Sequence, residues 1–284
     1  MKWTENRSGN VEDRRGKGGG GGLLGGGLVS LIIAAVVFFL GGDPSAILSS
    51  GIGANIPQTE QREPTSEELK TREFMEMLTA ESEITWTKIF QENGMQYRPA
   101  KVVMFSDVTQ SGCGTAQAAM GPFYCPSDET IYMDLSFFQE LQSRFGARVT
   151  EFSVAYVLAH EMGHHVQNIL GTLQKTEQLR RSGRYSQAQL NKVSVATELQ
   201  ADFYAGLWAR YTDDRARILE PGDIDAAISA AEAVGDDNIM KRSQGYVNQE
   251  AFTHGSSAQR KEWFMRGFNS GDIRQGNTFD ELLK

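Results

Sequence analysis

The stretch VLAHEMGHHVQN, residues 157–168, decides the fold of this 284-residue chain. It holds three of the four histidines in the protein. His160 and His164 are four positions apart, so on an α-helix they lie one above the other on the same face. The residues before them, VAYVLA, are apolar, which is typical of a helix buried up to this turn. We predict a long helix from Val149 to Leu170 that ends at Gly171.

His160, Glu161 and His164 match the pattern H-E-x-x-H. Two imidazoles at this spacing can bind one Zn²⁺ at about 2.0–2.1 Å each. Glu161 flanks the same face, where it can take a proton from water on the metal. A chance match on a surface helix is the alternative, but histidine is scarce here and the helix is apolar. His165 points about 100° away from His164, so we expect it to pack or to support the site.

Zinc in a catalytic site needs a third protein ligand and an open position for water. The segment TELQADFYAG, residues 197–206, offers Glu198 and Asp202 one turn apart on a helix predicted over residues 187–211. Two carboxylates in an apolar stretch are costly unless they are paired or bound to metal. We expect Glu198 to be the third ligand and Asp202 to accept the other N–H of a ligating histidine. The alternative is a solvated acidic edge of an amphipathic helix.

H-E-x-x-H followed by E-x-x-x-D on a second helix resembles the gluzincin metallopeptidases, which the 34-residue gap from His164 to Glu198 also suits. More closely, the chain resembles the bacterial neutral zinc metallopeptidase family over nearly its whole length. The motifs that carry this resemblance are NVEDRRG (10–16), a glycine run before one apolar stretch, CGTAQAAMGPFYCPSDETIYMDLSFF (113–138), HEMGHHVQN (160–168), ELQADFYAG (198–206) and AFTHGSSAQRKEWF (251–264). The resemblance implies a zinc-dependent endopeptidase.

The segment THGSSAQR, residues 253–260, looks like the part that closes the active site in related membrane-linked gluzincins. His254 then acts in catalysis by donating a hydrogen bond to the oxyanion of the scissile carbonyl. The alternative is that its imidazole caps the helix that begins near Ser256 or Ser257. We treat Arg260 as structural, in a salt bridge to a site carboxylate.

The sequence divides into four parts: an N-terminal segment (1–22), an apolar stretch (23–42), a linker (43–65) and a zinc metallopeptidase domain (66–284). The apolar stretch, LLGGGLVSLIIAAVVFFLGG, carries no charge and has about the 20 residues that a membrane-spanning helix needs. Basic residues before it predict a cytoplasmic N-terminus and a periplasmic domain, held in the inner membrane by a single pass. A cleaved signal peptide and a buried core helix are the alternatives.

The expected fold class is α+β and mostly helical, a zincin-like domain with a small β-sheet. Strands are predicted over 101–105 and 130–135. Further helices are predicted from Ser66 to Asn93, after Pro221, and from Ser257 to Phe268. GPFYCPSDETIYMD predicts a hairpin, which can lie beside the active-site cleft, where a substrate main chain can pair with it, or be an ordinary hairpin of the core; the two are not exclusive.

Cys113 and Cys125 are the only cysteines. If the domain lies outside the cytoplasm, we expect them to form a disulfide, because the glycines between them let the segment fold back. In a cytoplasmic protein they would be two buried thiols.

A formal net charge of −8 and the lack of a basic face argue against a nucleic-acid partner. The expected function is a membrane-anchored zinc endopeptidase that hydrolyses periplasmic proteins or peptides. One alternative is a non-catalytic envelope adaptor or binding protein with a structural zinc; such a site would need four protein ligands. Another is an inactive enzyme that holds unfolded chains.

Overall fold

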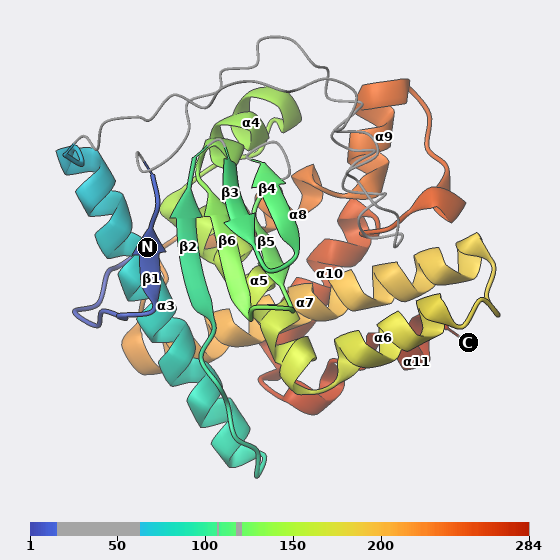
Figure 1. The fold of residues 1–284 in the computed structure, drawn as a ribbon, viewed down its shortest axis with the longest axis horizontal. Helices are drawn as coiled ribbons and strands as arrows, with labels where there is room; N and C mark the ends of the chain where they lie inside the picture. Colours follow the sequence, from blue (N-terminus) through green and yellow to red (C-terminus); the bar gives the residue numbers. More distant parts are fainter. Residues whose placement is uncertain (16–62, 107, 118–120, 284) are drawn as a thin grey trace.

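The computed structural model describes residues 1–15, 63–106, 108–117 and 121–283. In Figure 1 a small sheet lies in front of a layer of helices, and further helices continue to the right of it. The protein is therefore α+β and mostly helical, as the sequence predicts.

The strands are β1 (Val11–Asp13), β2 (Lys101–Phe105), β3 (Val108–Ser111), β4 (Gly114–Gln117), β5 (Phe123–Cys125) and β6 (Thr130–Asp134). The α-helices are α3 (Ser66–Glu92), α4 (Ser136–Phe145), α5 (Glu151–Ile169), α6 (Thr172–Arg181), α7 (Gln187–Ala216), α8 (Asp223–Ala233), α9 (Asp236–Gln244), α10 (Ser257–Ser270) and α11 (Thr278–Leu282). Two short 3₁₀ helices, Gln249–Ala251 and Ile273–Gln275, flank α10.

Four strands form a mixed sheet in the order β1-β2-β6-β5, in which β5 alone runs antiparallel to its neighbour. The two inner strands, β2 and β6, are apolar and almost entirely buried, as expected for strands covered on both faces. The predicted strand over 101–105 is confirmed, and β6 ends one residue before the predicted Leu135. The predicted hairpin is the pair β5 and β6, with β5 at the edge of the sheet.

A separate two-stranded sheet, β3 with β4, lies next to β5 (Figure 1). The disulfide between Cys113 and Cys125 joins the turn of this hairpin to the end of β5, with the two Cα atoms 5.8 Å apart. The expected bridge is therefore confirmed. It fixes the hairpin against the edge strand.

The two helices of the motif follow the prediction closely. α5 begins after Thr150, whose side chain forms a reciprocal capping box with Ser153. The chain leaves α5 at Gly171, which has a positive φ of 78° and lies where the helix was expected to end. α7 continues five residues beyond the predicted Tyr211, to Ala216. The apolar faces of both helices lie in one core with α3, α8 and α10.

Glycines bring the helices of this core into close contact. A β-carbon at Gly163, between His160 and His164 of α5, would lie 2.9 Å from the carbonyl oxygen of Ala201 on α7. Side chains larger than hydrogen at Gly206 or Gly267 would collide with the backbone where α7 crosses α10. Backbone packing at these points sets the distances between the site residues that the three helices carry.

Residues 1–15 pack on the domain, which the sequence did not predict. Val11–Asp13 forms β1, parallel to β2, and Trp3 stacks on Phe74 of α3 with ring centroids 5.1 Å apart. The folded body therefore includes residues on both sides of the apolar stretch. The predicted anchor, residues 23–42, and all but the last residues of the linker lie outside the described part of the chain. Among the described residues, no helix is both long and apolar enough to cross a membrane.

Candidate metal centre

α5 and α7 bring together the three residues that the sequence marked as ligands. The side chains of His160, His164 and Glu198 offer one ligand atom each, all within 4.8 Å of one another. The Nε2 atom of His160 lies 3.2 Å from one carboxylate oxygen of Glu198, and the Nε2 atom of His164 lies 3.6 Å from the other. All three side chains are buried or nearly so.

This donor set fits a zinc ion. Tetrahedral bonds of about 2.0–2.2 Å place neighbouring ligand atoms about 3.3–3.6 Å apart, close to the distances between the imidazole nitrogens and Glu198. Two imidazoles and one carboxylate are also the donors of several catalytic zinc sites, in which a fourth position stays open. The centre can therefore hold a divalent metal without rearrangement of the backbone.

The second nitrogen of each histidine is held by a hydrogen-bond acceptor. The Nδ1 of His160 lies 2.9 Å from Asp202, the partner that the sequence predicts. The Nδ1 of His164 lies 2.9 Å from the amide oxygen of Gln167. A carboxylate or amide oxygen accepts the Nδ1–H, so that both Nε2 lone pairs point to the metal position.

Gln167 was not among the residues that we singled out in the sequence. Its amide NH₂ donates to the carbonyl of Thr197, at 2.7 Å, and to Gln200, at 3.1 Å. These bonds fix the amide so that its oxygen faces His164. The available signal was its position three residues after His164, on the same face of the helix.

Asp202 is fully buried and binds three groups. Besides His160 it accepts from the hydroxyl of Tyr156, at 2.5 Å, and from two nitrogens of Arg260, at 2.7 and 2.9 Å. Burial by itself raises the pKa of Asp202, but Arg260 and His160 outweigh it and lower that pKa to about 2. The salt bridge expected of Arg260 thus lies directly behind a metal-site histidine.

The carboxylates also shift the pKa values of the two imidazoles. Burial lowers the pKa of His160, yet Asp202 and Glu198 outweigh this and raise it to about 10. Burial raises the pKa of Glu198, whereas the charge of His164 and hydrogen bonds from both histidines hold it well below its usual range. A cation bound here would displace protons from the imidazoles.

Glu161 lies beside the metal position, with a residue exposure of 7%. Burial raises its pKa, while His164 and His160 and a hydrogen bond from the backbone of Tyr124 act in the opposite direction. A carboxyl group with a raised pKa next to a metal position is suited to accept a proton and to return it.

Burial lowers the pKa of the His254 imidazole, whereas its hydrogen bond and ion pair with Asp236 raise that pKa, and the charge of Glu198 adds to the rise. Asp236 holds this loop: it accepts from the backbone N–H groups of Thr253, His254 and Gly255, at 2.6–2.9 Å, and lies 3.2 Å from the Nδ1 of His254. The hydroxyl of Ser256 caps α10. The interpretation of His254 as the helix cap is therefore wrong, and its role in catalysis stays a prediction.

His165 is fully buried and faces away from the centre, as expected. Its Nδ1 lies 3.0 Å from the hydroxyl of Tyr124 on β5, and its Nε2 lies 2.6 Å from the carbonyl of Arg98. It thus ties α5 to the edge strand of the sheet.

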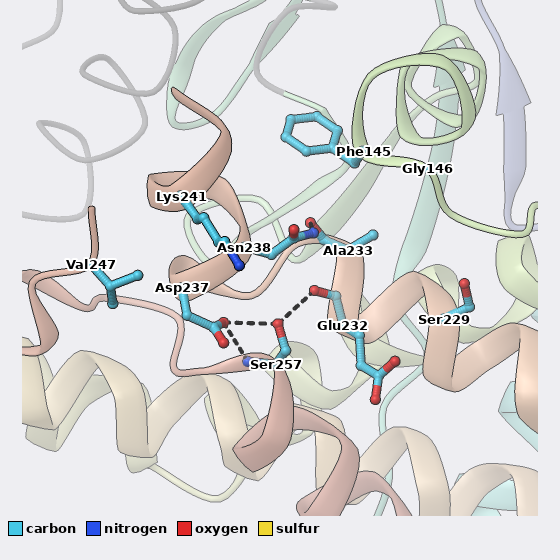
Figure 2. A pocket seen from close by; sticks show the side chains of 10 residues that line it. All are labelled: Phe145, Gly146, Ser229, Glu232, Ala233, Asp237, Asn238, Lys241, Val247 and Ser257. Carbon is cyan, nitrogen blue, oxygen red and sulfur yellow. Dashed lines mark hydrogen bonds between the residues drawn. The ribbon is translucent and has the colours of Figure 1, made fainter. Parts of the chain in front are cut away.

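A pocket of about 560 Å³ opens between α4, α8 and α9 (Figure 2). No metal-site residue lines it. Figure 2 shows Asp237 at one side, bonded to the backbone N–H and the hydroxyl of Ser257 at 2.7 and 2.8 Å. These bonds fasten α9 to the start of α10 and so support the loop that carries His254.

A buried pair of imidazoles, a carboxylate between them and a second carboxylate beside them define a metal centre of the kind that hydrolases use. Residues 1–279 match the family model described as "Putative neutral zinc metallopeptidase". The chain belongs to this family, which the sequence motifs had indicated.

Relatives extend the similarity to the full length. The chain is 41% identical over 295 residues to the "Uncharacterized protein YpfJ" of Escherichia coli K12, and the match covers 100% of both chains. It is 45% identical over 185 residues to the "Uncharacterized protein Mb2605" of Mycobacterium bovis, covering 62% of this chain and 61% of that protein. No solved structure matches the chain.

Proposed function

We propose that this protein is a zinc-dependent endopeptidase that hydrolyses peptide bonds in extracytoplasmic proteins or peptides. The observation that carries the proposal is the convergence of His160, His164 and Glu198 with Glu161 beside them. Among the described residues this group offers three ligands, not the four of a closed structural site. Three protein ligands leave a fourth position open for water, which supports a catalytic site rather than the structural zinc site of an adaptor protein.

A zinc ion held there would polarise the scissile carbonyl and lower the pKa of water toward about 7. Glu161 accepts a proton from the attacking water as the oxygen bonds to the carbonyl carbon. When the C–N bond breaks, Glu161 delivers that proton to the leaving amine. His254, oriented by Asp236, donates a hydrogen bond to the oxyanion.

The edge strand β5 supports a binding mode for an extended substrate. In the described part of the chain β5 pairs with β6 on one side, and the backbone of Tyr124 on β5 reaches Glu161. A peptide main chain that adds to the other side would run past the metal position.

The location is part of the proposal. The apolar stretch 23–42 supports attachment to the inner membrane between an N-terminal segment (1–22) and a linker (43–65). The bridge between Cys113 and Cys125 supports a periplasmic position for the domain (66–284), because disulfides persist in oxidising compartments. Protein or peptide substrates and the membrane are the partners that we propose.

The test replaces Glu161 by Gln, which keeps the shape but removes the base. We expect Glu161→Gln to bind one equivalent of zinc and to hydrolyse casein about 100- to 10,000-fold more slowly, the usual contribution of a general base. Glu140→Gln, which removes an exposed carboxylate of α4, is the control. Equal rates for Glu161→Gln and the parent protein would sink the assignment.

A further inference from the structure

Residues 1–15, the described part of the N-terminal segment (1–22), contribute a strand to the sheet of the domain. Val11 and Asp13 pair with Val102 and Met104 of β2. The backbone N–H of Val102 donates to Asn10, at 2.9 Å, and the N–H of Arg14 donates to Met104, at 2.8 Å. β1 is therefore one edge of the same sheet whose other edge, β5, borders the metal centre (Figure 1).

Polar side chains of residues 1–15 donate hydrogen bonds to two acidic side chains of α3. Glu81 is fully buried and accepts from Thr4, at 2.5 Å, and from Asn6, at 2.9 Å, besides its ion pair with Arg215 of α7. Ser8 and Asn10 both donate to Glu83, at 2.7 Å. A buried carboxylate that loses hydrogen-bond partners is costly, so these bonds favour a folded domain in which the segment is docked.

Trp3 connects the N-terminal residues to α5, the helix that carries His160 and His164. Its ring stacks on Phe74, and its indole N–H donates to Glu151 in the first turn of α5, at 3.2 Å. Val11 is buried in the main core. The segment thus touches α3, α5, α8 and β2, all of which belong to the expected peptidase domain.

Arg15, the last of residues 1–15, also contacts the start of α3. The guanidinium of Arg15 donates to the carbonyl of Glu68, in the first turn of α3, at 2.8 Å. Arg15 and the first turn of α3, which flank residues 16–62 in the sequence, are therefore held together.

We propose that residues 1–15 lie in the same compartment as the metal centre, as a permanent part of the peptidase domain. A strand and its hydrogen-bonded neighbour cannot lie on opposite sides of a bilayer, so this pairing is incompatible with the single crossing by residues 23–42 and the cytoplasmic N-terminus that the sequence predicts. Two crossings need two apolar stretches of about 20 residues. Residues 43–62 include Asp43, Glu60 and Arg62 and so supply no second one. Attachment to the membrane is then from one face.

Labelling of the full-length chain in bacterial cells tests this inference without reference to enzymatic activity. Gly9→Cys introduces a thiol at an exposed position where a β-carbon has no neighbour within 4 Å. Ser243→Cys places one at an exposed position of α9. A membrane-impermeant maleimide is added to intact spheroplasts and, separately, to detergent lysates. The parent chain, whose cysteines are bridged, gives the background, and Glu5→Cys is a second exposed site in the segment.

We expect Gly9→Cys and Ser243→Cys to be labelled to the same extent in intact spheroplasts. If Ser243→Cys reacts in spheroplasts while Gly9→Cys and Glu5→Cys react only after lysis, or the reverse, the inference is overturned. If all three react only after lysis, the shared compartment is upheld and the periplasmic location is refuted instead. None of these outcomes bears on whether the zinc centre is a peptidase.

Discussion

Each metal-site histidine is held by a different kind of group. Asp202, fixed in turn by Arg260 and Tyr156, orients His160 with a charge, whereas Gln167 orients His164 with a neutral amide. A carboxylate raises the basicity of the imidazole that it binds. We therefore expect the two histidines to contribute unequally to metal affinity.

Separate replacement of the two carboxylates of α7 distinguishes the proposed metal ligand, Glu198, from Asp202, which orients His160. Glu198→Ala removes a donor atom and should lower zinc content sharply. Asp202→Asn should lower zinc affinity by about 10- to 100-fold, as loss of an orienting partner does. Metal analysis after dialysis against a zinc buffer measures both, and Asp214→Asn, an exposed change on the same helix, is the control. Full zinc content in Glu198→Ala would move the third ligand elsewhere, with His254 as the next candidate.

Asp236 should give the protein an acid-sensitive contribution to stability. Burial raises its pKa, but hydrogen bonds from His254 and Thr253 and the charge of His254 lower it below the usual value. A depressed folded-state pKa means that the contribution is fully present above about pH 4 and is lost as the pH falls through the folded-state pKa.

Asp236→Asn should accordingly be less stable than the parent protein at pH 7, by about 1.5–3 kcal/mol. The gap should narrow below about pH 4. Urea unfolding of both proteins without metal, at several pH values, measures it, with Asp214→Asn for comparison. A gap that is constant over this pH range would contradict the assigned pKa direction.

The ligand residues were predictable because their chemistry is local: H-E-x-x-H and E-x-x-x-D each lie within one helical turn or two. The role of Gln167, and the hydrogen bonds by which Asp236 holds the loop of His254, were not predictable from the sequence. An amide has no preferred role in a motif, and Asp236 lies 18 residues before His254, so that only the folded loop brings them together.

Among the elements, long amphipathic helices and apolar strands were predicted well. α3, α5, β2 and β6 begin and end within about two residues of the expected positions. β1 was missed because it has three residues, of which Val11 alone is apolar, and its partner is 91 positions away. The short helices α4, α6, α9 and α11 were not predicted either.

The N-terminal segment should stabilise the domain through Glu81. The double variant Thr4→Val/Asn6→Ala leaves that buried carboxylate with Arg215 as its remaining side-chain partner. We expect the free energy of unfolding to fall by about 1–3 kcal/mol. Chemical denaturation of the purified full-length protein measures the change.

Arg7→Ala is the matched control, because the guanidinium of Arg7 is exposed and bonds to carbonyls within its own segment. An equal effect of the control and the double variant, or no effect of either, would show that the segment does not contribute through Glu81.

At the scale of the whole molecule, the centre is assembled from segments that are distant in the sequence. α5 supplies two ligands and Glu161, α7 the third ligand and Asp202, and α10 supplies Arg260. Glycine contacts at both crossings of α7 set their separation. The order of the helices could be predicted from the sequence. The distances between helices where they cross could not, because they depend on backbone contacts that no local sequence pattern encodes.

The central claim is that one zinc ion at this centre is needed for peptide-bond hydrolysis. The most direct measurement is casein hydrolysis by the purified full-length protein before metal removal, after treatment with a chelator, and after addition of one equivalent of zinc. We predict that hydrolysis disappears with the metal and returns at one equivalent. Hydrolysis at an unchanged rate after complete metal removal, or none by the fully zinc-loaded protein, would contradict the claim.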